Sequence, residues 1–351
     1  MAITINGTAN TVAGVAAGGI NDNVVDNGTM ADDAIGVAEL SATGTASSST
    51  YLRGDNSWAA VAGGVTSDGS NNTSGGTGPL ANLTSGSGLT AFGKDAMPAY
   101  TDAVNSVGIG FNALKVANAS GAVAIGKDAG LADTTGQITA IGEKALAANT
   151  TAHNNTAVGA EALEANVDSH SLTAVGFRAL EKVGPSASGS AHENTAIGKY
   201  AGRDLLTGWN STFLGNDAQG SSTSASNQIT LGNSSVNSLR CNETSIASLS
   251  DQRDKTDIVN LPAGLNFVKS LRPVKFKWAR RDPNDNDNDG KIRAGFLAQE
   301  LVTAMGSDST YLDLIMDDNP DKLEAKIGNL VPVLVQAIKE LEAKVAALEA
   351  G

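Results

Sequence analysis

Hydrophobic residues in the middle of the chain recur in one short unit, in which an aliphatic or aromatic residue directly precedes a glycine. Upstream of the glycine, Thr or Val usually alternates with a small residue and then Ile or Val, as in Thr195-Ala196-Ile197-Gly198, and this alternation is typical of a short strand. Successive units are 16 or 17 residues apart, with a single interval of 22. A fixed period of this length predicts stacked β-coils. The repeat glycines are Gly93, Gly110, Gly126, Gly142, Gly159, Gly176, Gly198, Gly215 and Gly232.

Each unit is long enough for two short strands and two turns, with the glycine allowing a tight bend and an alanine three residues later filling a narrow interior. One coil encloses too little apolar volume to be stable alone, so the neighbouring coils, and by extension neighbouring chains, must complete it. The expected fold is mainly β: an elongated homotrimer in which nine stacked β-roll or β-helix repeats over residues 88–236 are followed by an α+β domain that ends in a coiled-coil helix.

Composition sets the other boundaries. Residues 1–61 carry small and polar residues with scattered Val and Ile, which predicts short strands or extended chain, and residues 62–87 are rich in Gly, Ser and Asn, which predicts a linker. Residues 237–249 form a connector, and residues 250–351 hold 14 of the 24 lysines and arginines and show helical periodicity. The last segment is therefore expected to be a separate domain.

The first segment closes on Leu52-Arg53-Gly54-Asp55 followed by Trp58. This string resembles the N-terminal regions of many phage tail fibres, which implies that residues 1–61 attach the protein to another tail or baseplate protein. The Arg-Gly-Asp tripeptide within it is explained by turn chemistry better than by an adhesive function.

The repeats themselves resemble the head repeats of trimeric autotransporter adhesins, because Asn105-Ser106-Val107-Gly108-Ile109-Gly110 is close to their consensus. The resemblance implies a left-handed β-roll and a trimer, although the period here is longer. A bacterial adhesin of that class would need an export signal and a membrane anchor. The N-terminus has neither a basic nor an apolar leader region, and no uncharged apolar run approaches membrane-spanning length, so we expect synthesis in the host cytoplasm without membrane insertion.

All three histidines of the chain, His153, His170 and His192, stand six residues before a repeat glycine, and Trp209 holds the same position in the next unit. Stacked coils would align them in a column. Such a column could bind a receptor glycan, an anion or a metal, with the tryptophan as a stacking platform. The alternative is a loop position that tolerates any residue, since other units have Ser87, Val104, Ser120 and Gly136 there.

The C-terminal segment opens with Ser250-Asp251-Gln252-Arg253-Asp254-Lys255. Further on, Leu271 to Trp278 is expected to be a strand, and Ala294 to Leu301 to begin a helix. With Leu330 to Leu341, these four motifs resemble, in order, the intramolecular-chaperone auto-processing domain of phage tail fibres and tailspikes.

That resemblance implies trimerisation, assisted folding and self-cleavage of the Leu249–Ser250 bond, with Ser250 as nucleophile and Lys255 as general base. A serine hydroxyl needs a nearby base, and a lysine acts as one only if burial favours its neutral form. Asp254 stands where the family usually has an apolar residue, and a carboxylate beside Lys255 favours the ammonium.

The final residues 327–350 are expected to form a helix, with apolar side chains alternately four and three residues apart, as in a coiled coil. The seam residues are Ile327, Val331, Leu334, Ile338, Leu341, Val345 and Leu348. β-Branched residues at a and leucines at d favour two strands in an isolated peptide. About three heptads are too few to set the stoichiometry, so we expect the preceding domains to impose a trimer.

Composition narrows the function. The net charge of −13 opposes binding to nucleic acid, and a single cysteine, Cys241, expected to be buried or half-buried, excludes an intrachain disulfide or a cysteine metal cluster. An acidic loop at residues 282–290 fits part of a calcium loop that begins at Asp285, but its twelfth position is Phe296, so a solvated hairpin is the better interpretation. We expect no cofactor and no metal.

Three classes remain. A tail fibre of the virion that contacts a bacterial surface receptor, expected to be a glycan, accounts for the repeats, the absent leader and the C-terminal motifs together. A polysaccharide-degrading tailspike would need paired carboxylates in an aromatic-lined groove, whereas only 4% of the residues are aromatic and the acids of the repeats appear singly. A bacterial autotransporter accounts for the repeats only. No substrate-directed enzymatic activity is expected.

Overall fold

The computed structural model describes strands at 4–6, 11–13, 50–52 and 57–60, and the chain at 65–184, 191–242, 246–279 and 290–351. The chain divides into two compact units, Met1–Gly64 and Val65–Gly351. In the first unit, β1 (Thr4–Asn6) pairs antiparallel with β2 (Thr11–Ala13), and β3 (Thr50–Leu52) with β4 (Trp58–Ala60). Short strands were expected here. The Arg-Gly-Asp tripeptide lies outside the described residues.

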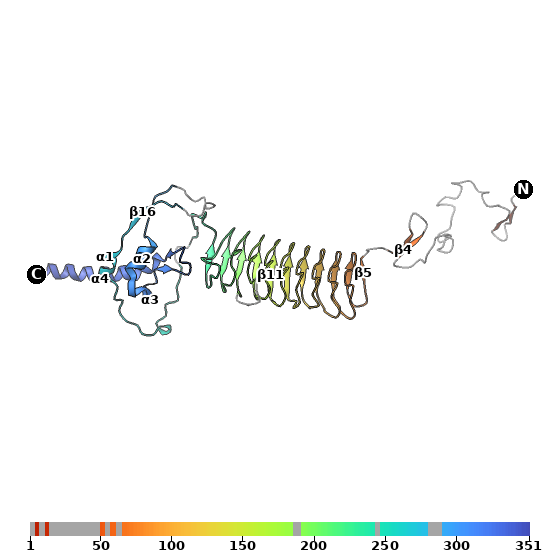
Figure 1. The fold of residues 1–351 in the computed structure, drawn as a ribbon, viewed down its shortest axis with the longest axis horizontal. Helices are drawn as coiled ribbons and strands as arrows, with labels where there is room; N and C mark the ends of the chain where they lie inside the picture. The colour runs from red at the N-terminus through yellow and green to blue at the C-terminus, as the bar shows by residue number, and fades with distance from the viewer. Residues whose placement is uncertain are drawn as a thin grey trace. The chain divides into compact units, whose positions relative to one another are not determined.

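The repeats form one sheet of eleven strands, stacked in chain order (Figure 1). β5 pairs antiparallel with β6, and β6 to β15 are all parallel to one another. Each coil contributes one strand to this sheet, and the rest of the coil is built of turns. The expectation of two strands in each unit is therefore wrong, because the segment after the glycine adopts turns instead of extended chain. The strands are β5 (Thr66–Ser67), β6 (Thr73–Gly75), β7 (Thr90–Phe92), β8 (Val107–Ile109), β9 (Val123–Ile125), β10 (Ile138–Ile141), β11 (Asn155–Val158), β12 (Thr173–Val175), β13 (Thr195–Ile197), β14 (Thr212–Leu214) and β15 (Ile229–Leu231).

The stack begins earlier than expected. Residues 62–87, which we interpreted as a linker, include β5 and β6, and β6 pairs in register with β7. Gly76 lies 17 residues before Gly93 and has the same positive φ. This coil escaped the sequence pattern because Gly75 replaces the usual aliphatic residue and Pro79 replaces the usual alanine.

The interior of the stack is narrow and is closed by the chain's own coils. The alanine that follows each repeat glycine by three residues is fully buried in all eight units that have it, as expected. Four leucines next to these alanines, Leu114, Leu146, Leu163 and Leu180, are also fully buried. Neighbouring coils are thus sufficient to shield the interior, and the expectation that other chains must complete it is wrong.

Residues 250–351 contain a second hydrophobic core, which is built from helices and short strands. Its buried residues include Leu301 and Met305 from α2 and Leu330 and Val333 from α4. The predicted strand is confirmed as β16, while the helix expected from Ala294 begins only at Ala298, because residues 293–295 pair with β16 instead. The elements are η1 (Gln252–Asp254), α1 (Leu265–Ser270), β16 (Val274–Phe276), β17 (Arg293–Gly295), α2 (Ala298–Met305), η2 (Gly306–Asp308), α3 (Ser309–Leu312), β18 (Ile315–Met316), β19 (Glu324–Ala325), η3 (Ile327–Asn329) and α4 (Leu330–Glu349).

The C-terminal helix α4 joins this core through one face. Pro332 lies in its first turn, where a missing N–H costs nothing. Further along, the Glu340 carboxylate accepts a hydrogen bond from the backbone N–H of Leu265 at 2.9 Å and so caps the start of α1. This bond and one from Gln336 lower the pKa of the Glu340 carboxyl. α4 is thereby fixed to α1.

Six of the seven seam residues lie on α4, on a stripe beside the buried one. Ile327 lies in η3, so the helix expected over residues 327–350 begins only at Leu330. All seven seam residues are exposed in the single chain. Among the described helices, none is both long and apolar enough to cross a membrane.

Candidate functional site

The predicted nucleophile and base meet at the start of the C-terminal domain. The Lys255 Nζ lies 2.6 Å from the Ser250 Oγ and 3.4 Å from the Ser250 backbone oxygen. The turn of η1 brings them together, since the Asp251 side chain caps it by accepting from the Arg253 N–H at 2.9 Å. The Arg253 guanidinium also holds the pKa of the Asp251 carboxyl below its usual range. Local chain geometry therefore forms the serine–lysine pair.

Solvent surrounds this pair in the single chain. Ser250 and Lys255 are exposed, and Leu249, on the other side of the predicted scissile bond, is fully exposed. Asp254 is also exposed. A lysine that accepts a proton from serine requires a desolvated environment. The two groups are thus in contact with each other and exposed in the single chain.

The three histidines form the predicted column. The ring centroids of His153 and His170 are 4.1 Å apart, and those of His170 and His192 are 5.3 Å apart with the rings nearly parallel. Burial lowers the pKa of His170, and the neighbouring His153 and His192 lower it further, against the opposing effect of Asp168. Trp209 continues the position in the next coil and is about half exposed (48%).

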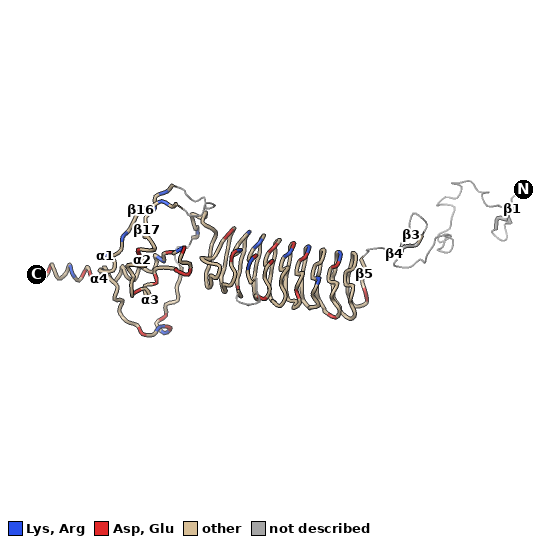
Figure 2. Tube along the Cα trace, in the orientation of Figure 1, with Lys and Arg blue, Asp and Glu red and all other residues tan. Residues whose placement is uncertain are grey.

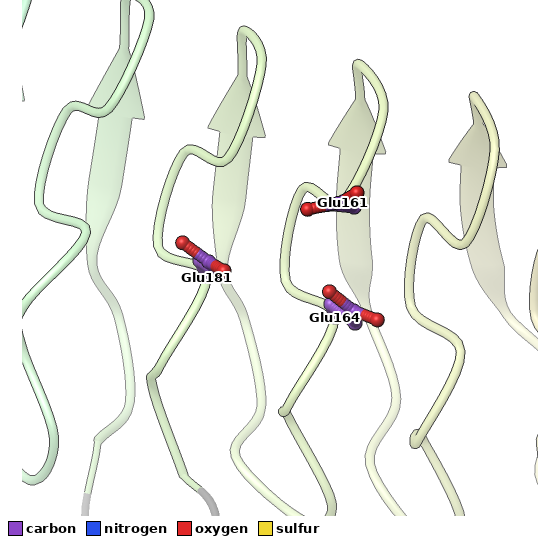
Figure 3. Close-up of side chains that lie close together, drawn as sticks. All are labelled: Glu161, Glu164 and Glu181. Carbon is purple, nitrogen blue, oxygen red and sulfur yellow. The ribbon is translucent and has the colours of Figure 1, made fainter.

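Three glutamates come together on the turns of adjacent coils, although we expected the acids to be isolated. One carboxylate oxygen from each of Glu161, Glu164 and Glu181 lies within 4.8 Å of the others (Figure 3). Glu164 and Glu181 stand five residues after successive repeat glycines, so aligning the repeats would have revealed this pair. Arg178 pairs with Glu161 and, at 3.7 Å, with Glu181, and Lys144 pairs with Glu164 at 3.1 Å. These ion pairs account for the cluster without a metal ion.

Polar groups also lie inside the stack, and the sequence pattern did not predict them. Asp133 is fully buried, and its carboxylate accepts hydrogen bonds from Asn149 Nδ2 at 2.8 Å and from the Gly136 N–H at 3.1 Å. Burial raises the pKa of this carboxyl above its usual range, and burial likewise raises the pKa of the Tyr100 hydroxyl. An Asn149–Asn166 contact at 3.2 Å continues the chain of hydrogen bonds into the next coil. We interpret these groups as joining successive coils.

The outward side of the strands carries an unbroken row of large apolar residues. In β7 to β14 the residue two positions before the repeat glycine, such as Ala124, Ala140 or Ala157, is buried, and the residues on either side of it are at least partly exposed. The residue directly before each repeat glycine pairs with its counterpart in the next coil, and the row, here called the outer ladder, is Phe92, Ile109, Ile125, Ile141, Val158, Val175, Ile197, Leu214 and Leu231.

The outer ladder is at least partly open to solvent along its whole length. Ile197 is 44% exposed and Leu214 is 46% exposed. The described strands β6 to β15 contain no Asp, Glu, Lys or Arg, and the charged residues lie in the turns instead (Figure 2). Large apolar side chains without charges between them are typical of a protein interface.

Two further expectations concerned Cys241 and the acidic loop. Cys241 is exposed, and not buried as we expected, because it lies in the extended connector after the last coil. The acidic loop considered for calcium lies outside the described residues except for Gly290.

Comparison with known families finds one match. A family model described as the chaperone of endosialidase matches residues 250–308. The chain therefore carries a chaperone domain of the type found in phage tail fibres and tailspikes, joined to a β-solenoid. Residues 309–351 lie beyond the match. No curated protein and no solved structure matches the chain.

Proposed function

We propose that this protein is a trimeric bacteriophage tail fibre, located in the virion, that contacts the host cell surface. The observation that carries the proposal is the chaperone domain at residues 250–308, which follows in the sequence a solenoid whose outer ladder is at least partly exposed. In this proposal residues 1–61 attach the fibre to another tail or baseplate protein, and residues 250–351 direct the folding of three chains together.

Two apolar surfaces support the trimer. The outer ladder and the seam of α4 both expose large aliphatic side chains that the single chain does not cover. Burial of apolar surface stabilises by about 25 cal/mol per Å², so a surface with many aliphatic rungs favours association strongly. Three chains, and not two, follow from the kind of chaperone domain the chain carries.

We further propose that the chaperone domain cuts the Leu249–Ser250 bond. The Ser250 Oγ attacks the Leu249 carbonyl carbon while Lys255 Nζ, at 2.6 Å, accepts the hydroxyl proton. The proton then passes to the departing Ser250 nitrogen, and water hydrolyses the resulting ester to release residues 1–249 and restore the hydroxyl. The exposed pair requires cover before the amine can act as a base, so cleavage is expected only after the chains associate.

Mass spectrometry of the expressed protein tests this step. The unaltered chain is expected to yield two fragments, residues 1–249 and 250–351, whereas Ser250→Ala and Lys255→Met are expected to remain at full length. Ser248→Ala makes the same change two residues upstream and is expected to cleave normally. An intact unaltered chain in an assembled trimer contradicts the cleavage proposal and leaves the trimer proposal standing.

Receptor contact is proposed for the column of His153, His170, His192 and Trp209. The exposed indole offers a face on which a sugar ring stacks, and the imidazoles beside it offer N–H donors to sugar hydroxyls or to an anion. A substrate-degrading function gains no support from the three clustered glutamates, because Arg178 and Lys144 already pair with them.

A competition assay tests host contact. The purified trimer, which retains residues 1–249 whether or not cleavage occurs, is expected to bind the host bacterium and to block adsorption of the phage. Trp209→Ala is expected to weaken that binding about tenfold, as loss of a central aromatic contact commonly does. Val116→Ala, a change at another exposed apolar side chain of the solenoid, is expected to have no effect. Equal binding by all three proteins removes the column from the receptor site, and absence of binding by the unaltered trimer contradicts the tail-fibre function.

A further inference from the structure

Two rings of the histidine column also accept hydrogen bonds from backbone N–H groups of the preceding coils. The backbone N–H of His153 donates to the Nδ1 of His170 at 3.1 Å, and the backbone N–H of His170 donates to the Nδ1 of His192 at 3.2 Å. Since a backbone N–H can only donate, both Nδ1 atoms must be unprotonated acceptors. His170 and His192 are therefore neutral rings with their proton on Nε2, and each is a hydrogen-bonded rung between coils.

The same position forms rungs with serine elsewhere in the stack. The backbone N–H of Val104 donates to the Ser120 Oγ at 3.0 Å, and the backbone N–H of Trp209 donates to the Ser226 Oγ at 3.1 Å. Ser120 and Ser226 also stand six residues before a repeat glycine. The same position thus supplies a side-chain acceptor in four coils, and two of these acceptors are imidazole and two are hydroxyl. A hydroxyl keeps its acceptor lone pairs in acid, and an imidazole loses its acceptor when it is protonated.

We infer that the coils between His153 and His192 form a proton-sensitive section of the solenoid, held closed by neutral imidazole rungs and loosened by acid. Protonation of His170 or His192 removes the acceptor from a backbone N–H, and it also places positive charges on rings 4.1 to 5.3 Å apart. Asp168, in the same coil as His170, carries a negative charge that favours the protonated ring, and it therefore acts to raise the pKa of His170.

The direction of the pH dependence follows from the chemistry. The folded pKa of His170 is lowered below its ordinary value of 6.5. The stability that the neutral ring contributes is therefore fully present above pH 6.5 and is lost as the pH falls through that value and below it.

His153 provides a matched control. If His153 formed a rung, its ring would have to accept a hydrogen bond from the backbone N–H of Gly136. That N–H already donates to the Asp133 carboxylate at 3.1 Å. The His153 ring therefore lies against the His170 ring, tilted by 37°, without serving as a rung to the preceding coil. His153→Ser changes the same residue type in the same column and leaves both imidazole rungs in place.

Hydrogen exchange of the assembled protein at about pH 8 and about pH 5 tests the inference, with rates corrected for intrinsic exchange. Protection of the His153 and His170 amides is expected to fall about fivefold or more in acid, the effect of losing one hydrogen bond. Protection of the Val104 and Trp209 amides, which donate to serines, is expected to change little. Equal changes at all four amides, or no change at any, would overturn the inference.

Variants extend the test. His170→Ser with His192→Ser copies the serine rungs and is expected to abolish the pH dependence at residues 153 and 170, whereas His153→Ser is expected to retain it. A pH dependence that survives the double change contradicts the imidazole rungs. Exchange in the unaltered protein decides the matter even if the double variant fails to fold.

Discussion

Gly142→Ala is expected to destabilise the solenoid by roughly 3 kcal/mol or more, enough to lower its thermal midpoint sharply. Gly142 has a φ of +135°, and a Cβ at this position would lie 2.5 Å from the backbone carbon and oxygen of Gly159 in the next coil. Neither coil can move away, because the N–H groups of Gly142 and Gly159 are tied to the preceding coils by 2.7 Å hydrogen bonds. Each coil is stabilised by its neighbours, so one displaced coil weakens the stack on both sides.

Gly121→Ala separates this clash from simple backbone strain. Gly121 also has positive φ, +79°, but a Cβ there meets nothing within 4 Å. Its substitution is expected to cost only about 1 kcal/mol, the penalty for a side chain in a left-handed conformation. Thermal unfolding followed by circular dichroism compares the two variants. Similar losses in both would show that close stacking of the repeat glycines is not what the structure requires.

Ile338→Asp is expected to abolish assembly while leaving the single chain folded. Ile338 lies at the centre of the α4 seam and is 66% exposed in the single chain, so a polar residue there disturbs little of the domain core. In a trimer three copies of the isoleucine meet, each contributing about 2 kcal/mol on burial. Loss of these contacts, with three carboxylates brought together, is expected to weaken association by at least about a thousandfold.

Sedimentation velocity measures the outcome, and Ala346→Asp is the control. Ala346 is an exposed residue of the same helix outside the seam, so its substitution introduces the same charge without removing an apolar contact. This variant is expected to sediment as a trimer, like the unaltered protein. A trimer that survives Ile338→Asp would exclude the seam as an assembly element, and a dimer in the unaltered protein would contradict the proposed stoichiometry.

Several features could be predicted because they follow from spacing along the chain. A column of histidines requires only that equivalent positions of successive coils lie one above another. The contact of Ser250 with Lys255 is within reach of one short turn. The exposed seam of α4 follows from helical periodicity, since the buried residues Leu330, Val333 and Ala337 form a separate, adjacent stripe of the helix.

Other features depend on partners that spacing does not reveal. The ion pairs of Glu161 and Glu164 join different coils, and they appear only when the side chains of those coils are placed together. The rungs of His170 and His192 depend on a backbone N–H in the preceding coil, which no side-chain pattern records. The first coil was missed because its Gly75 and Pro79 depart from the repeat, yet its backbone follows the same path.

The sequence by itself determined the repeat, its period and the order of the domains, because strand length, turn residues and helical periodicity are local properties. Only the tertiary structure decided which side of each strand is inside. Alternation in Thr195-Ala196-Ile197 predicts two faces without saying which is buried, and hydrophobicity alone favours the isoleucine. The structure buries the alanine instead, since the coil is too narrow for a larger residue at most strand positions, and so turns an apolar ladder towards the solvent.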